Sequence, residues 1–294
     1  MTITPGIDVG GAYTKVVLLD GEQIIGRSIL RTGYKPGMAA EQSLTSALAD
    51  AGIGRDRLDY VVATGFGRFQ VAFSQLNVTE LTAAAWGAHE LFPGTRTILD
   101  VGGHAVKASR IDESRQVKSF RLNEKCAAGT GAFLEKTARY MGFNADQIGA
   151  LAATSSIVVP ISGVCTVFAE AEVINHLSQG IAAADIMNGA IASLVGKSVQ
   201  LMKRVKMEPE VTLIGGIMRF PTMVSAIRDT VPGDINVPQG DPVQYVAALG
   251  SGIPAQPQVH RPPETGPPPA GQPSPGRPTA SLSPDRAAPA AAPR

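Results

Sequence analysis

The sequence has few of the features that mark secreted, membrane-spanning or nucleic-acid-binding proteins. It contains only two cysteines, too few for the disulfide framework of a small secreted domain. No apolar run reaches the roughly 18–20 residues of a membrane helix, and the N-terminus lacks the basic and apolar regions of a signal peptide. Lys and Arg total 26 against 25 Asp and Glu, which leaves no basic footprint for a polyanion. We expect a cytoplasmic protein that binds neither nucleic acid nor membranes.

Proline is concentrated at one end of the chain. Of the 22 prolines, 13 lie in Pro254–Arg294, a segment that has no Phe, Trp, Tyr or Cys. Such a segment cannot bury enough apolar surface to offset the entropy lost on ordering, so we predict that it is disordered. The rest of the chain is long enough for two domains, at roughly 100–200 residues each. We place them at residues 1–95 and 96–253.

Within these residues, strand-like runs rich in β-branched side chains alternate with alanine-rich helical stretches. This alternation predicts an α/β fold. The clearest elements are a hairpin over Ile3–Leu19, a helix over Met38–Ala51, a strand over Tyr60–Thr64, a helix over Glu80–Leu91, a strand over Thr97–Val101 and a helix near Pro221–Asp229.

One local pattern occurs twice. An apolar run ends in an aspartate and a glycine pair, and a lysine follows seven residues after the aspartate: Asp8 with Lys15, and Asp100 with Lys107. The aspartate offers a carboxylate to Mg²⁺ or water, and the glycine turn lets backbone N–H groups approach phosphates. Two copies predict a clamp on one polyphosphate, while a bare hairpin turn is the alternative for each copy. The glycine pairs are Gly10-Gly11 and Gly102-Gly103.

A third glycine pair, Gly215-Gly216, follows another apolar run. Its lack of side chains leaves room for a nucleobase or ribose, although a turn that contacts no ligand explains it equally well. The sequence has neither a Walker A motif nor a strand followed by G-x-G-x-x-G. If the chain binds a nucleotide, it therefore uses neither the P-loop nor the dinucleotide-binding fold.

Two longer segments around the cysteines carry a more specific signal. The two segments are Asn123–Glu135 and Val164–Ile174, and three shorter ones are Ala63–Arg68, Thr79–Leu81 and Ala247–Gly250. By these segments and by its glycine motifs, the chain resembles the ATPase activators of 2-hydroxyacyl-CoA dehydratases and the related ATPase subunits of benzoyl-CoA reductase. These proteins belong to the superfamily of actin, heat-shock chaperones and sugar kinases.

The resemblance implies two related actin-like, ribonuclease-H-like domains with ATP in the cleft between them. Asp8 and Asp100 would be the catalytic carboxylates that hold Mg²⁺ and water. Gly215 and Gly216 would face the adenosine. The residues expected around the phosphates are Gly10, Gly11, Thr14, Lys15, Gly102 and Gly103.

The cysteines, Cys126 and Cys165, suit an iron–sulfur centre. A 4Fe–4S cluster usually takes four thiolates, so a chain with two cysteines must share the cluster across a symmetric dimer. Each cysteine precedes a helical apolar pattern, and a helix N-terminus stabilises a thiolate. Two buried core cysteines without metal are the alternative. The apolar positions are Phe133, Leu134, Thr137, Ala138 and Met141 after the first cysteine, and Val167, Phe168, Ala171, Ile174 and Leu177 after the second.

In the family that the chain resembles, ATP hydrolysis drives a low-potential electron into a radical enzyme. The implied partners are a second copy or a paralogous ATPase subunit, a low-potential ferredoxin or flavodoxin as donor, and a radical acyl-CoA dehydratase or aromatic-ring reductase as acceptor. Sensitivity to oxygen follows from a cluster that is open to solvent at the dimer seam. The other classes of function are a small-molecule kinase of the amino-sugar type and a non-catalytic nucleotide sensor.

The chain departs from this family's usual pattern after the second glycine pair. His104 and Ala105 stand where the family usually has Gln-Asp. The change removes an amide and a carboxylate beside the expected γ-phosphate, so the resemblance implies slow or altered ATP turnover. His104 either replaces the amide as a donor or serves as a structural hydrogen-bonding residue.

Overall fold

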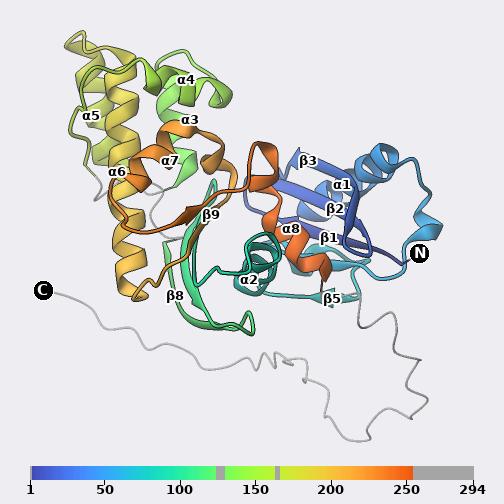
Figure 1. Cartoon of the computed structure of the whole chain (residues 1–294). Coiled ribbons are helices and arrows are strands. Elements are labelled where there is room, and N and C mark those ends of the chain that lie inside the picture. The colour runs from blue at the N-terminus through green and yellow to red at the C-terminus, as the bar shows by residue number, and fades with distance from the viewer. Residues whose placement is uncertain (1, 124–129, 163–165, 254–294) are drawn as a thin grey trace, which may run out of the picture. The chain divides into compact units, whose positions relative to one another are not determined.

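The computed structural model describes residues 2–123, 130–162 and 166–253. These residues belong to one compact unit, Met1–His260 (Figure 1). The segment predicted to be disordered and both cysteines, Cys126 and Cys165, lie outside the described residues. Within the described ranges, no helix combines the length and hydropathy needed to cross a membrane.

The first sheet has five strands in the order β3-β2-β1-β4-β5. The first three form an antiparallel meander, whereas β4 and β5 run parallel to β1. The Gly10 N–H donates to the Tyr13 carbonyl at 3.1 Å and closes the predicted hairpin. The strands are β1 (Ile3–Val9), β2 (Tyr13–Asp20), β3 (Gln23–Arg31), β4 (Val62–Thr64) and β5 (Leu76–Asn77).

The second sheet repeats this arrangement, with the order β10-β9-β6-β7-β8 and the same pattern of parallel and antiparallel pairs. The predicted α/β class is therefore confirmed as two sheets of one topology. In both hairpins the register sets the aspartate directly opposite the lysine, so the seven-residue spacing reflects a cross-strand pair. The strands are β6 (Thr97–Val101), β7 (Val106–Ile111), β8 (Val117–Asn123), β9 (Val211–Ile214) and β10 (Ile235–Asn236).

Helices cover both faces of the first sheet. Helix α1 (Pro36–Ala51) packs on the face that carries Val16 and Leu18. Helix α8 (Val246–Gly252) packs on the opposite face, against Val17 and Leu19, because neighbouring residues of a strand point to opposite sides. The chain thus returns to the first sheet after it has completed the second. The division at residues 95 and 96 stays a prediction.

Helix α2 (Glu80–Leu91) crosses α8 closely, in the position where Figure 1 shows the two helices together. A Cβ atom at Gly250 would clash with the carbonyl oxygen of Ala83, and one at Gly87 would clash with that of Val246. The crossing therefore depends on two glycines that lack side chains.

The second sheet packs against helices that share one large core. The predicted stripe on α3 is buried at Phe133, Leu134, Thr137 and Ala138. The stripe on α5 lies mostly on the outside, because α5 turns Ala169 and Val173 into the core instead. The helices are α3 (Gly131–Tyr140), α4 (Ile148–Ala153), α5 (Thr166–Ser178), α6 (Ala183–Arg204) and α7 (Pro221–Arg228).

The α2–α8 crossing yields a stability prediction. We expect Gly250→Ala to lower the free energy of unfolding by about 1–3 kcal/mol, because the new methyl group meets the backbone of α2. The matched control is Gly196→Ala in α6, where a Cβ would meet nothing within 4 Å. That control should be neutral or stabilising by up to about 1 kcal/mol. Urea unfolding of both variants measures the difference, and equal midpoints would contradict the proposed close packing.

Candidate active site: a cleft between the two sheets

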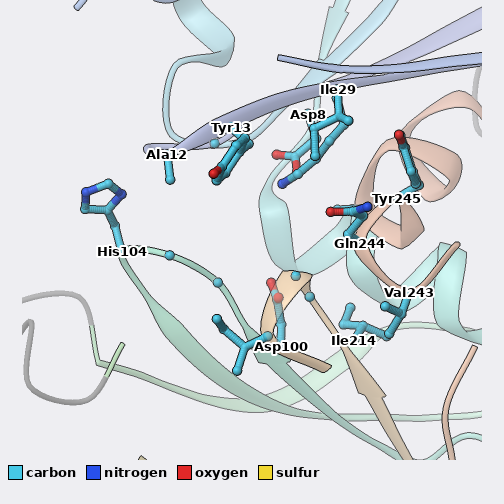
Figure 2. A pocket seen from close by; sticks show the side chains of 18 of the residues that line it. Asp8, Ala12, Tyr13, Ile29, Asp100, His104, Ile214, Val243, Gln244 and Tyr245 are labelled. Atoms are coloured by element: carbon cyan, nitrogen blue, oxygen red, sulfur yellow. The ribbon is translucent and has the colours of Figure 1, made fainter. Parts of the chain in front are cut away.

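A cavity of about 1030 Å³ is lined by the ends of both hairpins and by the turn after β9 (Figure 2). It contains every predicted nucleotide-site residue except Thr14. Asp8 and Asp100 approach it from different sheets, and Figure 2 shows both directed into the same space. The predicted residues that line it are Asp8, Gly10, Gly11, Lys15, Asp100, Gly102, Gly103, Gly215 and Gly216.

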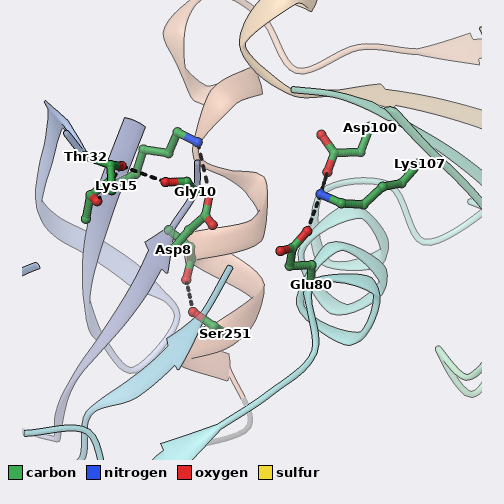
Figure 3. Close-up of polar contacts among 10 residues, drawn as sticks. Asp8, Gly10, Lys15, Thr32, Glu80, Asp100, Lys107 and Ser251 are labelled. Atoms are coloured by element: carbon green, nitrogen blue, oxygen red, sulfur yellow. Dashed lines mark hydrogen bonds and ion pairs between the residues drawn. The ribbon is translucent and has the colours of Figure 1, made fainter. Parts of the chain in front are cut away.

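Thr14 is fully buried behind the first hairpin turn. Its Oγ1 lies 3.0 Å from Oγ1 of Thr32, and Thr32 Oγ1 donates to the Gly10 carbonyl at 2.7 Å (Figure 3). Through these hydrogen bonds, the two hydroxyls stabilise the glycine turn. The contact of Thr14 with phosphate stays a prediction, and the geometry gives this residue an indirect role.

Each aspartate is paired with the lysine of its own hairpin. Lys15 Nζ lies 3.0 Å from Asp8 Oδ2, and Lys107 Nζ lies 3.2 Å from Asp100 Oδ2 (Figure 3). Lys107 also pairs with the Glu80 carboxylate. Burial alone lowers the pKa of Lys107, but the carboxylates of Asp100 and Glu80 outweigh it and raise the pKa well above its ordinary value. Lys107 is therefore a permanent cation at the wall of the cavity.

Glu80 is a cavity residue to which sequence reasoning gave no role. It is the first residue of α2, directly after Thr79, whose side chain accepts a hydrogen bond from the Thr82 N–H at 3.1 Å. The threonine is an N-cap, and an acid beside it suits the positive end of a helix. The predicted helix over Glu80–Leu91 is confirmed, whereas only the packing of α2 beside β6 and β8 brings the Glu80 carboxylate to Lys107.

The two hairpin turns touch across one end of the cleft. A Cβ at Gly11 would come 2.9 Å from His104 Nδ1, and one at Gly103 would come 2.8 Å from the Ala12 methyl group. His104 stands beside Ala12 at the edge of the view in Figure 2. The absence of side chains at Gly11 and Gly103 is thus required for the two turns to meet.

The third glycine turn packs against the end of β6. Gly215 has φ +99°, and a Cβ there would lie 2.7 Å from Asp100 Oδ1. Its N–H donates to the Val243 carbonyl at 2.9 Å. Glycine is needed at this position both for its backbone conformation and for the close approach to Asp100.

Helix α3 is bonded directly to the second hairpin turn. The Gly131 N–H donates to the Gly102 carbonyl at 3.0 Å, and the Ala132 N–H donates to the Gly103 carbonyl at 2.7 Å. The first turn of α3 therefore uses its free N–H groups on the glycine turn that lines the cavity. A displacement of that turn would be transmitted to α3.

Helix α3 is in turn tied to α5. Lys136 Nζ lies 2.6 Å from Glu170 Oε1, and the Tyr140 hydroxyl donates to Glu170 Oε2 at 3.3 Å. The neighbouring acid, Glu172, accepts a hydrogen bond from the Ser162 N–H at 2.5 Å. The hydrogen bond to Glu170 raises the pKa of Lys136, which keeps the ammonium charged.

Two sheets of one strand order, around a cleft lined by two Asp-x-Gly-Gly hairpins and a third glycine turn, define an actin-like ATPase. The sequence places the chain more narrowly. A model of the BadF/BadG/BcrA/BcrD ATPase family matches residues 6–250, and the chain belongs to this family.

Similar proteins include two activators of acyl-CoA dehydratases and a subunit of benzoyl-CoA reductase. The activator of lactoyl-CoA dehydratase from Anaerotignum propionicum is 36% identical over 251 residues, 85% of this chain and 96% of that protein. A benzoyl-CoA reductase subunit from Thauera aromatica is 36% identical over 237 residues, 79% of this chain and 84% of that protein. The structure of the activator of 2-hydroxyisocaproyl-CoA dehydratase from Clostridium difficile, with bound ADPNP, superposes with a TM-score of 0.82 at 32% identity, covering 88% of this chain and 96% of that one.

The charge arrangement in the cleft yields a pH-dependent prediction. We expect Lys107→Met to destabilise the protein by about 2 kcal/mol near pH 8, because Glu80 and Asp100 lose their shared cation. The neighbouring carboxylates raise the pKa of Lys107 in the folded protein, so the stability that its charge contributes is present below its ordinary pKa and is lost as the pH rises above that value. The destabilisation of Lys107→Met relative to the wild type is therefore present near pH 8 and decreases toward about pH 11, above the ordinary lysine pKa.

The measurement is urea unfolding at several pH values between about 8 and 11, a range that spans the ordinary pKa of lysine. Arg55→Met removes the partner of Glu41 in an exposed pair and serves as the control, with an expected effect below about 1 kcal/mol at every pH. A deficit in Lys107→Met that does not shrink toward alkaline pH would contradict the assigned charges.

Proposed function

We propose that this chain is an ATP-dependent electron-transfer protein, which couples ATP hydrolysis to the delivery of a low-potential electron to a radical acyl-CoA enzyme. Membership of the ATPase family and similarity to dehydratase activators support the proposal. The observation that carries it is the pair of hydrogen bonds from α3 to the Gly102-Gly103 turn. They join the nucleotide cleft to a helix that begins five residues after Cys126.

We place Mg²⁺ and the triphosphate between the two hairpins. Mg²⁺ is commonly held by one or two carboxylates together with substrate phosphates, and Asp8 and Asp100 offer that donor set from opposite walls of one cavity. Bound Mg²⁺ would neutralise phosphate charge. Lys15 and Lys107 would add positive charge beside it, since hydrolysis of this kind depends mainly on positioning and charge. His104 and Ala105, in place of the Gln-Asp that the resembled family usually has, would slow or alter turnover.

We assign Cys126 and Cys165 to a 4Fe–4S cluster that two chains share. The donor set supports this assignment, because each chain contains two thiols and a cluster usually needs four. When bound, the cluster would supply a one-electron carrier of low potential. Because a cluster at a seam between chains is accessible to solvent, we expect the protein to be sensitive to oxygen.

An exposed apolar surface on α5 supports the dimer. Val167 is 71% exposed, Phe168 64% and Ile174 54%, although all three side chains are large and apolar. Exposed apolar residues that gather on one helix favour burial against another chain. Since α5 begins directly after Cys165, a second copy or a paralogous ATPase subunit on this surface would bring its own cysteines to the same place.

The acceptor in this proposal is a radical acyl-CoA dehydratase or an aromatic-ring reductase, and the proposal is supported by similarity to an activator of lactoyl-CoA dehydratase and to a benzoyl-CoA reductase subunit. The donor would be a low-potential ferredoxin or flavodoxin. The site of action would be the cytoplasm, where thiols are kept reduced.

The cluster assignment predicts the metal content. Protein purified without oxygen should contain about two irons and two sulfides per chain and have the mass of a dimer. Cys126→Ser and Cys165→Ser should each lose the iron and still bind ATP, because the residues predicted to hold the nucleotide include no cysteine. Iron, sulfide and native mass are measured together on the same sample. A metal-free monomer that binds ATP would contradict the electron-transfer proposal and favour a kinase or a nucleotide sensor.

The contacts that link the cleft to α5 through α3 predict that Glu170 affects the response of α5 to nucleotide without affecting nucleotide binding. We expect Glu170→Gln to leave ATP affinity within about twofold, and to reduce the change that ADPNP causes in amide hydrogen exchange over α5, because the charged link to Lys136 is lost. Glu41→Gln makes the same chemical change in the exposed pair with Arg55 and should behave as the wild type. A full ADPNP response in Glu170→Gln would remove Lys136 and Glu170 from the path.

A further inference from the structure

Arg219 occupies the end of the cavity formed by the third glycine turn. It is the last residue of η5 (Gly216–Arg219), and its guanidinium is held at three points. Nε donates to the Gly216 carbonyl at 3.2 Å, Nη2 lies 3.3 Å from Asp146 Oδ1, and the group lies 5.9 Å from the centre of the Phe220 ring. Its orientation is thus set by contacts from η5 and from η4 (Ala145–Gln147).

These contacts contribute little to the stability of the fold. The Asp146 side chain is 85% exposed and that of Arg219 33%, so water screens their attraction. Phe220 is buried, while the guanidinium lies in the cavity lining beside Gly215 and Gly216. The Arg219 guanidinium is therefore a flat, permanently charged group at the cavity wall. Among the contacts described, it has no buried ionic partner.

We propose that Arg219 is the residue that recognises the base, by stacking its guanidinium against the purine ring of the nucleotide. A guanidinium is planar, delocalised and weakly hydrated, and it stacks on π systems better than an ammonium does. The neighbouring glycines have no side chains to occupy the space above it. Purines offer a larger face than pyrimidines, so the site selects purine nucleoside triphosphates. The inference rests on the proposed function only in requiring that the cleft binds a nucleotide.

The test compares ligands with and without a base. Titration calorimetry of the full chain with Mg²⁺ and ATP, CTP or inorganic tripolyphosphate measures the three affinities. We expect Arg219→Gln to weaken ATP by about 5- to 30-fold, the range of a cation–π contact in a partly desolvated site. Tripolyphosphate should change by less than about twofold, because the stack involves no phosphate, and the preference for ATP over CTP should fall.

Two further variants keep the test decisive. Arg219→Lys retains the charge and loses the plane, so its ATP affinity should be closer to that of Arg219→Gln than to the wild type. Arg55→Gln is the matched control. Arg55 is exposed and its guanidinium also lies over an aromatic ring, 4.8 Å from the centre of the Phe73 ring, but it does not line the cleft. This variant should leave all three affinities unchanged. Steady-state ATPase rates should show a higher KM for Arg219→Gln at nearly constant kcat.

The outcomes distinguish the stacking role of Arg219 from the proposed nucleotide site itself. Equal loss of ATP and tripolyphosphate affinity would mean that Arg219 only attracts negative charge, and unchanged ATP affinity would mean that the base lies elsewhere. Either result overturns the inference and leaves the ATPase proposal standing. A wild-type chain that binds neither ATP nor tripolyphosphate would overturn the nucleotide site itself.

Discussion

The cross-strand pairing of an aspartate with a lysine at the end of each sheet is the interaction on which the cleft depends. Asp8 faces Lys15 and Asp100 faces Lys107 because antiparallel strands set them opposite each other. Each pair sets a carboxylate against an ammonium at a partly buried wall, where a lone charge would be costly. Two hairpins that converge on one cavity thus present two carboxylates and two cations to whatever binds there.

The second constraint is the close approach of backbone segments, which glycine permits at two contacts. Gly11 and Gly103 let the hairpin turns touch, and Gly87 with Gly250 lets α2 cross α8. These contacts bring segments distant in sequence together without side chains between them. A substitution at any of the four would therefore alter how the two halves meet, even where no side-chain interaction is lost.

The hydrogen bonds between α3 and the Gly102-Gly103 turn join the cleft to the rest of the second half. Because the N–H groups of a first helical turn have no partners within the helix, they are free to bind a neighbouring loop. The link continues through Lys136 and Glu170 to α5, whose apolar outer surface is exposed. A ligand that moves the turn would therefore affect the surface on which we propose the second chain.

The sequence by itself determined the α/β class, the glycine turns and the repeated spacing of aspartate and lysine, because these are local patterns along the chain. It also predicted that helices follow both cysteines. Only the tertiary structure decided that Glu80 joins Lys107, that Thr14 lies behind the turn, and that the apolar stripe of α5 faces outward. Helical periodicity identifies an apolar face without saying what covers it, and contacts between distant segments depend on how whole elements pack.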